Sequence, residues 1–194
     1  MKTKQLILAT LALVFTANVF ATEIPQMNII PLEDTKTLVA VTQDTPALNQ
    51  ISIISEKGET VYFKQSTKKT AGYKKIFDLS QLEDGAYTVK LKAGSATVKR
   101  EMKINNGTIS VEAQKSELDP FFAFDNNVVK VSYLNFDEKD VVVSVYDKHQ
   151  LIHQSKLGNE FTINKGINLS ELKRGEYEIV LANAGKEYWF SVKR

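Results

Sequence analysis

The sequence contains no cysteine among its 194 residues. This absence excludes disulfide bonds, thiolate metal sites and cysteine nucleophiles, together with a lipidated amino-terminal cysteine as a membrane anchor. Small exported domains of animal origin usually depend on disulfides. If the chain is exported, the absence of cysteine therefore indicates a bacterial periplasmic or secreted protein.

Histidine is almost as scarce, since His149 and His153 are the only two. On a helix, a spacing of four would place both rings on one face, where they could hold a metal ion. The surrounding residues indicate a turn followed by a strand, in which the two positions lie roughly 13 Å apart at about 3.3 Å per residue. We therefore expect two solvent-facing histidines and no metal site.

Catalytic signatures are also missing. The sequence has no Gly-x-Ser-x-Gly nucleophile elbow and no glycine-rich phosphate loop. It offers no catalytic residue and no cofactor-binding residue, so we expect a protein that is not an enzyme.

Acidic side chains offer a calcium site as an alternative. Asp137, Glu138 and Asp140 share one expected loop, and Asp119 stands near Asp125 in another. Carboxylate oxygens in loops are the ligands that Ca²⁺ takes, but calcium loops usually contain glycine within Asp/Asn repeats, which these stretches lack. We interpret them as surface acids interleaved with lysines and expect no metal.

One apolar run stands at the start of the chain. Leu6–Phe15 follows Lys2 and Lys4 and precedes the small residue Ala21. This order is typical of a secretory signal peptide, so residues 1–21 are predicted to be cleaved. A bilayer span needs about 20 apolar residues, and the charged segment from Glu23 onward keeps this run shorter.

The chain that remains after this cleavage carries no net charge. Removal of residues 1–21 leaves 194 − 21 = 173 residues, with 25 − 2 = 23 basic and 23 acidic side chains. A neutral chain argues against a surface dedicated to nucleic acid or to an anionic membrane. The mature chain is expected to have no membrane span and to be periplasmic or secreted.

An internal repeat is the most informative feature that is present. The segment LSQLEDGAY at Leu79–Tyr87 recurs as LSELKRGEY at Leu169–Tyr177, an offset of 90 residues. The same offset aligns Leu38–Thr42 with Val128–Ser132. A fixed period over a whole segment indicates duplication. We predict tandem copies at residues 22–115 and 116–194.

Apolar residues alternate with polar ones within each copy. Tyr87, Val89 and Leu91 illustrate the period of two, which predicts half-buried strands, and no segment after the signal predicts an amphipathic helix. Each copy contains about six or seven short strands, as a sandwich requires. The predicted fold class is all-β, with two tandem immunoglobulin-like (fibronectin III-like) β-sandwiches.

The repeated Leu-Ser-x-Leu-x-x-Gly-x-Tyr element predicts a structural motif. Its leucines would cap the sandwich, and its glycine, Gly85 or Gly175, would take a positive φ in a tight turn. Tyr87 and Tyr177 would bury their rings while each hydroxyl bonds an upstream backbone group, as in the tyrosine corner of immunoglobulin-like domains.

The second copy also resembles a known family. The resemblance is carried by Val141–Tyr146, the Asp147-Lys148 turn, the motif through Ile179 and the closing Ser191–Arg194. These segments resemble the C-terminal sorting domain of the type IX secretion system, and equally the secreted immunoglobulin-like repeats related to it. The first copy resembles them more weakly. The resemblance implies a β-sandwich and, for a sorting domain, recognition by secretion machinery.

A lysine-rich segment and two aromatic clusters remain. The range 64–75 holds five lysines around a tyrosine in an expected loop, which would bind a polyanion or blunt a sheet edge. Alternation places Trp189 opposite Tyr188 and Phe190, so that an exposed ring could stack on a sugar or anchor a partner. Among Phe121, Phe122 and Phe124, we expect the latter two to pack between the copies.

The sequence favours an exported, non-catalytic interaction or structural module. Its partner would be a protein or a glycan of unknown identity. In the alternative interpretation, the second copy is the address that a secretion machine reads, and deletion of residues 118–194 would then abolish export.

Overall fold

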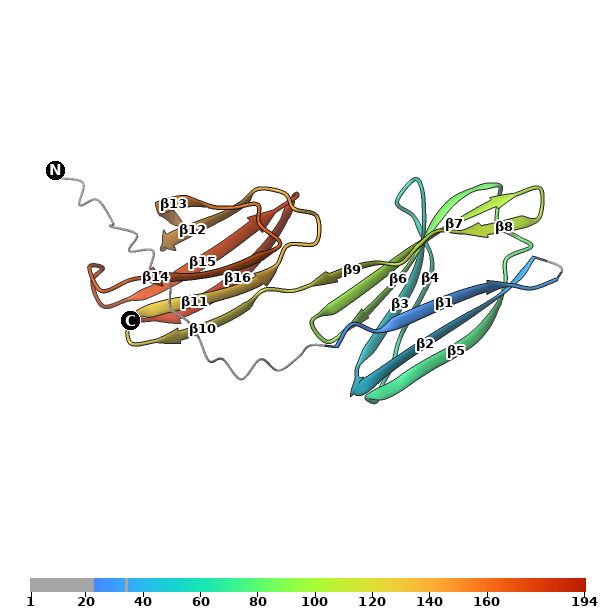
Figure 1. The fold of residues 1–194 in the computed structure, drawn as a ribbon, viewed down its shortest axis with the longest axis horizontal. Helices are drawn as coiled ribbons and strands as arrows, with labels where there is room; N and C mark the ends of the chain where they lie inside the picture. Colours follow the sequence, from blue (N-terminus) through green and yellow to red (C-terminus); the bar gives the residue numbers. More distant parts are fainter. Residues whose placement is uncertain (1–22, 34) are drawn as a thin grey trace. The chain divides into compact units, whose positions relative to one another are not determined.

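A computed structural model describes residues 23–33 and 35–194. The predicted signal peptide at residues 1–21 lies outside the described residues. Regular structure is entirely β-strand (Figure 1), which confirms the all-β prediction. In the described ranges, no helix reaches the length and hydropathy that a bilayer span requires.

The chain forms two compact units that divide between Leu118 and Asp119. The strands of the first unit are β1 (Gln26–Pro31), β2 (Lys36–Ala47), β3 (Asn49–Ser55), β4 (Thr60–Gln65), β5 (Thr70–Asp78), β6 (Gly85–Ala93), β7 (Ala96–Asn105), β8 (Thr108–Val111) and β9 (Lys115–Leu118). The strands of the second unit are β10 (Phe121–Asp125), β11 (Val128–Leu134), β12 (Val141–Asp147), β13 (Gln150–Gly158), β14 (Thr162–Asn168), β15 (Glu176–Asn183) and β16 (Lys186–Lys193).

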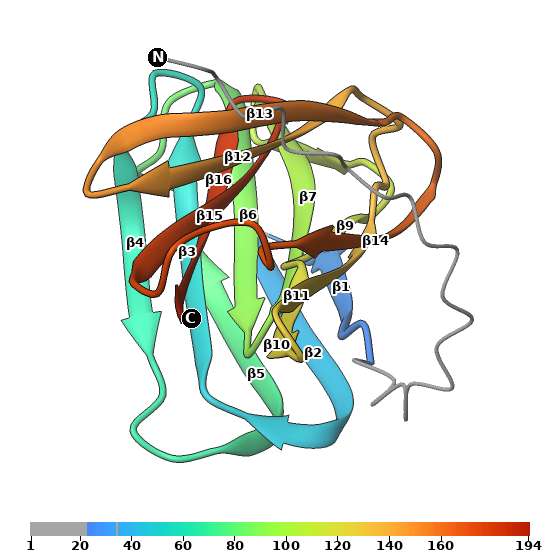
Figure 2. The same ribbon diagram turned by 90° about the vertical axis from the view of Figure 1, so that its left-hand side faces the viewer.

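The two units share one sheet topology. The first has a sheet β1-β2-β5 and a sheet β4-β3-β6-β7-β8, whose central strands run side by side in Figure 2. The second has β10-β11-β14 and β13-β12-β15-β16, so β10–β16 repeat β1–β7 in order. In both, the fourth strand pairs with the third, whereas in constant-type immunoglobulin domains it joins the other sheet. The predicted immunoglobulin-like sandwiches are confirmed.

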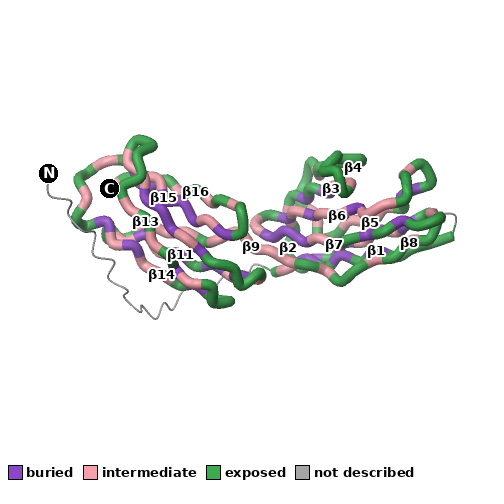
Figure 3. The backbone as a smooth tube through the Cα atoms, turned by 90° about the horizontal axis from the view of Figure 1, so that it is seen from above, coloured by how far each residue is buried: buried purple, intermediate pink, exposed green. Residues whose placement is uncertain are grey.

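Each unit buries its own core. Buried residues alternate with more exposed ones along the paired strands (Figure 3), because successive side chains of a strand point to opposite faces. Val89 and Leu91 are buried in the first core, and Ile179 and Leu181 take the same places in the second. Burial of a large aliphatic side chain contributes about 1.5–3 kcal/mol. The period of two therefore correctly predicted the inward faces.

The repeated motif forms a tyrosine corner in both units. The buried Tyr87 hydroxyl donates to the carbonyl oxygen of Glu83 at 2.9 Å. The Tyr177 hydroxyl donates to the carbonyl oxygen of Lys173 at 2.8 Å. Both tyrosines are therefore structural, as predicted.

The glycine of the motif has the predicted positive φ in the first unit only. Gly85 has a φ of 158°, whereas Gly175 is not among the glycines with positive φ. Gly175 instead pairs with Arg194: its N–H donates to the Arg194 carbonyl at 3.2 Å, and its own carbonyl accepts the Arg194 N–H at 2.9 Å. The prediction of a positive φ is therefore wrong for Gly175, because its backbone already pairs with that of Arg194.

The first unit carries two strands that the repeat did not predict. After a turn at Asn106 and Gly107, β8 pairs with the end of β7, and β9 then pairs with its beginning. Between them, the Gln114 side chain reaches the other sheet, where it accepts the Met27 N–H at 2.8 Å and donates to the Pro25 carbonyl at 3.0 Å. The polar segment after β7 thus closes one side of the first sandwich.

Candidate functional site

The outer face of the sheet β13-β12-β15-β16 carries a pair of aromatic rings, one of them exposed. Tyr188 and Phe190 pack against the core, so Trp189 between them points outward, with 57% of its surface exposed. The predicted exposure of Trp189 is confirmed. On β12, Val145 is buried inward and its neighbour Tyr146 therefore points outward as well.

The Tyr146 and Trp189 rings stack on one another. Their centroids lie 6.0 Å apart and their planes differ by 24°. Val180 pairs with Trp189 on one side and with Ser144 on the other, and although both occupy outer-face positions, only 3% and 5% of their surfaces are exposed. We call Ser144, Tyr146, Val180 and Trp189 the aromatic face. The sequence indicated Trp189 alone, although the alternation along β12 already placed Tyr146 outward.

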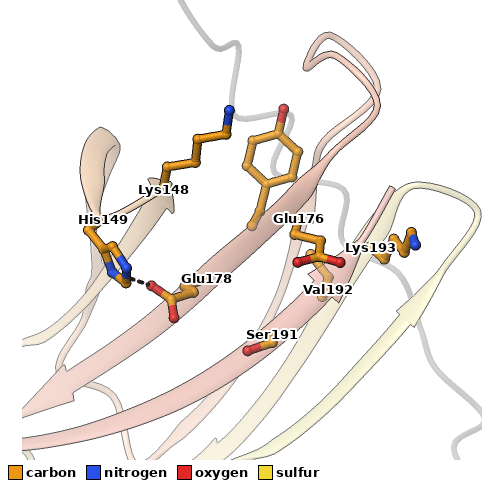
Figure 4. Close-up of a pocket in the computed structure, with 8 residues that line it drawn as sticks. Lys148, His149, Glu176, Glu178, Ser191, Val192 and Lys193 are labelled. Atoms are coloured by element: carbon orange, nitrogen blue, oxygen red, sulfur yellow. Dashed lines mark ion pairs between the residues drawn. The ribbon is translucent and has the colours of Figure 1, made fainter.

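A groove of about 580 Å³ lies at one end of this face (Figure 4). Glu178 connects the groove to the face, since it pairs with Tyr146 on β12 and with Ser191 on β16. Its carboxylate lies 3.6 Å from Nδ1 of His149 in the β12–β13 turn. The residues that line the groove are Lys148, His149, Glu176, Tyr177, Glu178, Ser191, Val192 and Lys193.

A second groove, of about 520 Å³, lies at the opposite end. Val142, Ala182 and Glu187 line it from three adjacent strands, on which they pair directly. The turn at Ala184 and Gly185 forms its rim. The aromatic face is therefore flanked by hollows that contain carboxylates, amines and hydroxyls, a composition that suits hydrogen bonding to a polar ligand.

The two histidines do not come together as a metal site. His149 is exposed in the turn, whereas His153 is half-buried on β13 and its Nε2 is buried without a hydrogen-bond partner. The expectation that both face solvent is wrong for His153, because it pairs with the inward-facing Val145.

The candidate calcium ligands are also separate. Asp140 lies 3.7 Å from the Lys156 amine, and Asp125 lies 3.3 Å from that of Lys130. In residues 23–33 and 35–194, no group of three or more His, Asp or Glu side chains could hold a metal ion.

The lysine-rich segment is mostly strand rather than loop. It covers the end of β4 and the start of β5, which are edge strands of the two sheets of the first unit. Lys75 donates to the Tyr62 hydroxyl at 3.1 Å and lies 4.3 Å above its ring and 4.7 Å above that of Phe77. The expectation of a loop is wrong because the inward residues of this segment close the sandwich between β4 and β5.

Tyr62 and Tyr73 share a hydrogen bond of 3.4 Å in the same cluster. Burial and that bond raise the pKa of Tyr73. Partial burial alone would raise the pKa of Tyr62, but its hydrogen bonds to Tyr73 and Lys75 outweigh burial and lower this pKa. The Lys75 ammonium therefore favours the ionised form of Tyr62.

Phe122 and Phe124 pack against the core of the second unit. The Phe122 ring stacks on that of Phe190 at 5.2 Å with an interplanar angle of 8°. The expectation that these rings pack between the copies is wrong, because β10 places them over the open side of their own sandwich. Phe121, next to them, is 62% exposed.

Comparison with known proteins supports the family resemblance. Residues 31–105 match the family described as the secretion system C-terminal sorting domain. This match lies in the first unit, whereas the sequence resemblance was assigned chiefly to the second. It fits an exported protein. No curated protein matches the chain.

Matches among solved structures include domains of a biofilm-associated protein and of human OSCAR. The BSP domain of the biofilm-associated protein is 17% identical with a TM-score of 0.28, and the match covers 88% of this chain and 29% of that chain. The human OSCAR ligand-binding domain is 8% identical with a TM-score of 0.25, and the match covers 88% of this chain and 97% of that chain.

Proposed function

We propose that this protein is an exported, non-catalytic binding module whose contact surface is the aromatic face of the second unit. The observation that carries the proposal is the 57% exposure of Trp189 on a regular strand, stacked on Tyr146. Single exposed rings are common on protein surfaces, whereas contiguous exposed apolar surface, such as two stacked rings, marks interaction sites. The family match supports export, to the periplasm or the cell exterior.

The ligand class that this face suits best is a glycan. A planar ring offers an apolar surface to the C–H face of a sugar, while Glu178, Ser191 and Glu187 beside it supply hydroxyl and carboxylate partners for sugar hydroxyls. A neutral glycan fits this face best, because the grooves at both of its ends carry lysine amines as well as carboxylates.

Trp189 provides the test, since it is the only tryptophan in the sequence. Titration of the mature chain with soluble oligosaccharides from cellulose and chitin should change the tryptophan fluorescence, which reports on this face alone. Trp189→Ala and Tyr146→Ala should each weaken retention on the matching polysaccharide by about tenfold or more, since loss of a stacked ring costs about 1–3 kcal/mol.

Phe63→Ala is the matched control. Phe63 is 59% exposed on β4 of the first unit. The Phe63→Ala variant should bind the polysaccharide like the unaltered protein. If the Trp189 variant is retained as strongly as the control, a glycan does not bind at this face. If the fluorescence of Trp189 changes only when a protein ligand is added, the partner of this face is a protein.

A second candidate function is an address for secretion, which the family match favours. The matched residues 31–105 lie in the first unit, whereas the resemblance in the sequence points to the second copy. Two deletions distinguish the roles in native cells: one removes residues 22–118 and the other residues 119–194, and both keep the predicted signal. If one deletion variant stays inside the cell while the other is exported normally, the unit missing from the retained variant is the address.

A further inference from the structure

The strand β16 ends the sheet of the second unit with a long, regular edge. It spans eight residues and pairs with β15 throughout without a register shift. In the described part of the chain, no strand pairs with its other side. The longer edge strands β5 and β13 both contain register shifts, and the remaining edge strands are shorter.

The hydrogen bonds of β16 fix which backbone groups face the open side. Gly175 and Arg194 exchange both N–H···O bonds, so alternate residues of β16 point their N–H and C=O groups toward β15. The intervening residues Glu187, Trp189, Ser191 and Lys193 therefore point theirs outward. Such a row of unpaired groups is a template for another strand.

The first unit covers the same edge. There β9 pairs with Ala96–Lys99 of β7, the residues equivalent to Lys186–Trp189, and β8 pairs with Met102–Asn105. A salt bridge of 2.9 Å between Lys99 and Glu117 connects β7 and β9. The fold thus accepts an antiparallel strand at this position, with opposite charges on the two strands.

We propose that β16 pairs in antiparallel fashion with β16 of a second copy of this chain, about a twofold axis at Phe190. In this register Glu187 lies opposite Lys193 of the second copy, and Lys193 lies opposite its Glu187. Trp189 lies opposite Ser191 of the second copy. The interface is isologous, as in most homodimers, and extends two four-stranded sheets into one.

Charge complementarity selects this register and this occupant. A shift by two residues in one direction places Trp189 opposite Trp189 of the second copy, and Lys193 opposite Gly185 of the second copy. The opposite shift places Lys193 opposite Trp189 and leaves Glu187 without an opposing residue of β16. Only the register centred on Phe190 pairs both charges, and opposite charges that face each other across strands are stabilising.

The test is the oligomeric state of the full mature chain, residues 22–194, by sedimentation velocity and equilibrium over a concentration series. The unaltered chain should dimerise. Glu187→Lys and Lys193→Glu should each raise the dimer dissociation constant by about tenfold or more, because each creates two like-charge pairs by symmetry. The double variant Glu187→Lys with Lys193→Glu should dimerise like the unaltered chain, since the complementarity is restored.

Two further variants separate pairing from folding. Ser191→Pro removes an outward N–H, which an edge strand tolerates, so the chain should stay folded by circular dichroism but remain monomeric. Lys103→Glu changes the equivalent lysine of the covered strand β7 and should dimerise normally. The proposal would be overturned if the unaltered chain were monomeric at all concentrations. It would also be overturned if the charge reversals and the proline variant dimerised like the unaltered chain.

Discussion

The outer faces of the two equivalent sheets differ sharply in chemistry although their strands pair in the same register. Lys90 of the first unit pairs with Ser52, and its equivalent Val180 pairs with Ser144. Lys99 of the first unit likewise takes the place of Trp189. Two lysines at the centre of one face are thus replaced by apolar side chains in the other. This difference shows that a sandwich keeps its fold while the chemistry of its outer face changes, because the fold depends on the inward side chains of the core.

The open side between the two sheets shows a second difference. In the first unit Arg100 bridges the sheets with a hydrogen bond of 3.2 Å to the Met27 carbonyl, and it also donates to the Glu112 carbonyl at 2.8 Å. The equivalent positions in the second unit hold Phe190 and Phe122, which stack. The first unit is closed by polar side chains and its following segment, and the second by aromatic rings.

The largest expected effect tests whether the two cores are independent. Leu91→Ala and Leu181→Ala remove equivalent, fully buried side chains from the two cores, and each should destabilise its own unit by about 2–5 kcal/mol. Calorimetry should show one unfolding transition shifted by each variant and the other unchanged. A shift of both transitions by either variant would contradict the independence.

The next effect sharpens the contrast between the two closures. Phe190→Ala should cost about 2–3 kcal/mol, because a half-buried ring and its stacking on Phe122 are lost. Arg100→Ala should cost only about 1 kcal/mol, since it removes partly exposed hydrogen bonds. Urea denaturation of the two variants measures both losses. Equal costs would show that the two closures are energetically equivalent.

The tyrosine corners should not differ between the units. Tyr87→Phe and Tyr177→Phe each remove one hydroxyl that bonds a backbone carbonyl, with lengths of 2.9 and 2.8 Å. Both should lower the free energy of unfolding by about 1 kcal/mol. Thermal denaturation of the two variants, beside the unaltered chain, measures the effect. If only one of the two variants lost stability, the tyrosine corner would stabilise that unit alone.

The smallest effect concerns the edge between β4 and β5, where Tyr62 takes the position that His153 has in the second unit. Its pKa lies below the ordinary value of about 10, so its ionisation adds stability above that value, and this contribution is lost as pH falls. Lys75→Met should raise the pKa of Tyr62. Ultraviolet titration of tyrosinate, with Tyr62→Phe as the difference standard, measures the change. An unaltered titration would show that Lys75 does not act on this hydroxyl.

Several features of the site could be predicted from the sequence, and others could not. The period of two correctly placed Trp189 outward, because alternation is a property of the strand itself. The stack of Trp189 on Tyr146 joins residues more than forty positions apart in the chain, and no local pattern indicates it. The sequence did not indicate that His153 is partly buried or that Lys75 points inward. Both are polar residues on edge strands, and a polar residue in the sequence is expected to face solvent.

The sequence by itself determined the repeat, the strand faces and the tyrosine corners, because each depends on residues close together in the chain or on a fixed period. Only the tertiary structure decided which edges are covered. The segment 112–118 is polar and carries no strand signal of its own, yet its residues Lys115–Leu118 pair with β7 because β7 offers them unpaired backbone groups. The equivalent edge of β16 offers the same groups to another strand, and this opportunity follows from the pairing of the sheet rather than from any local sequence.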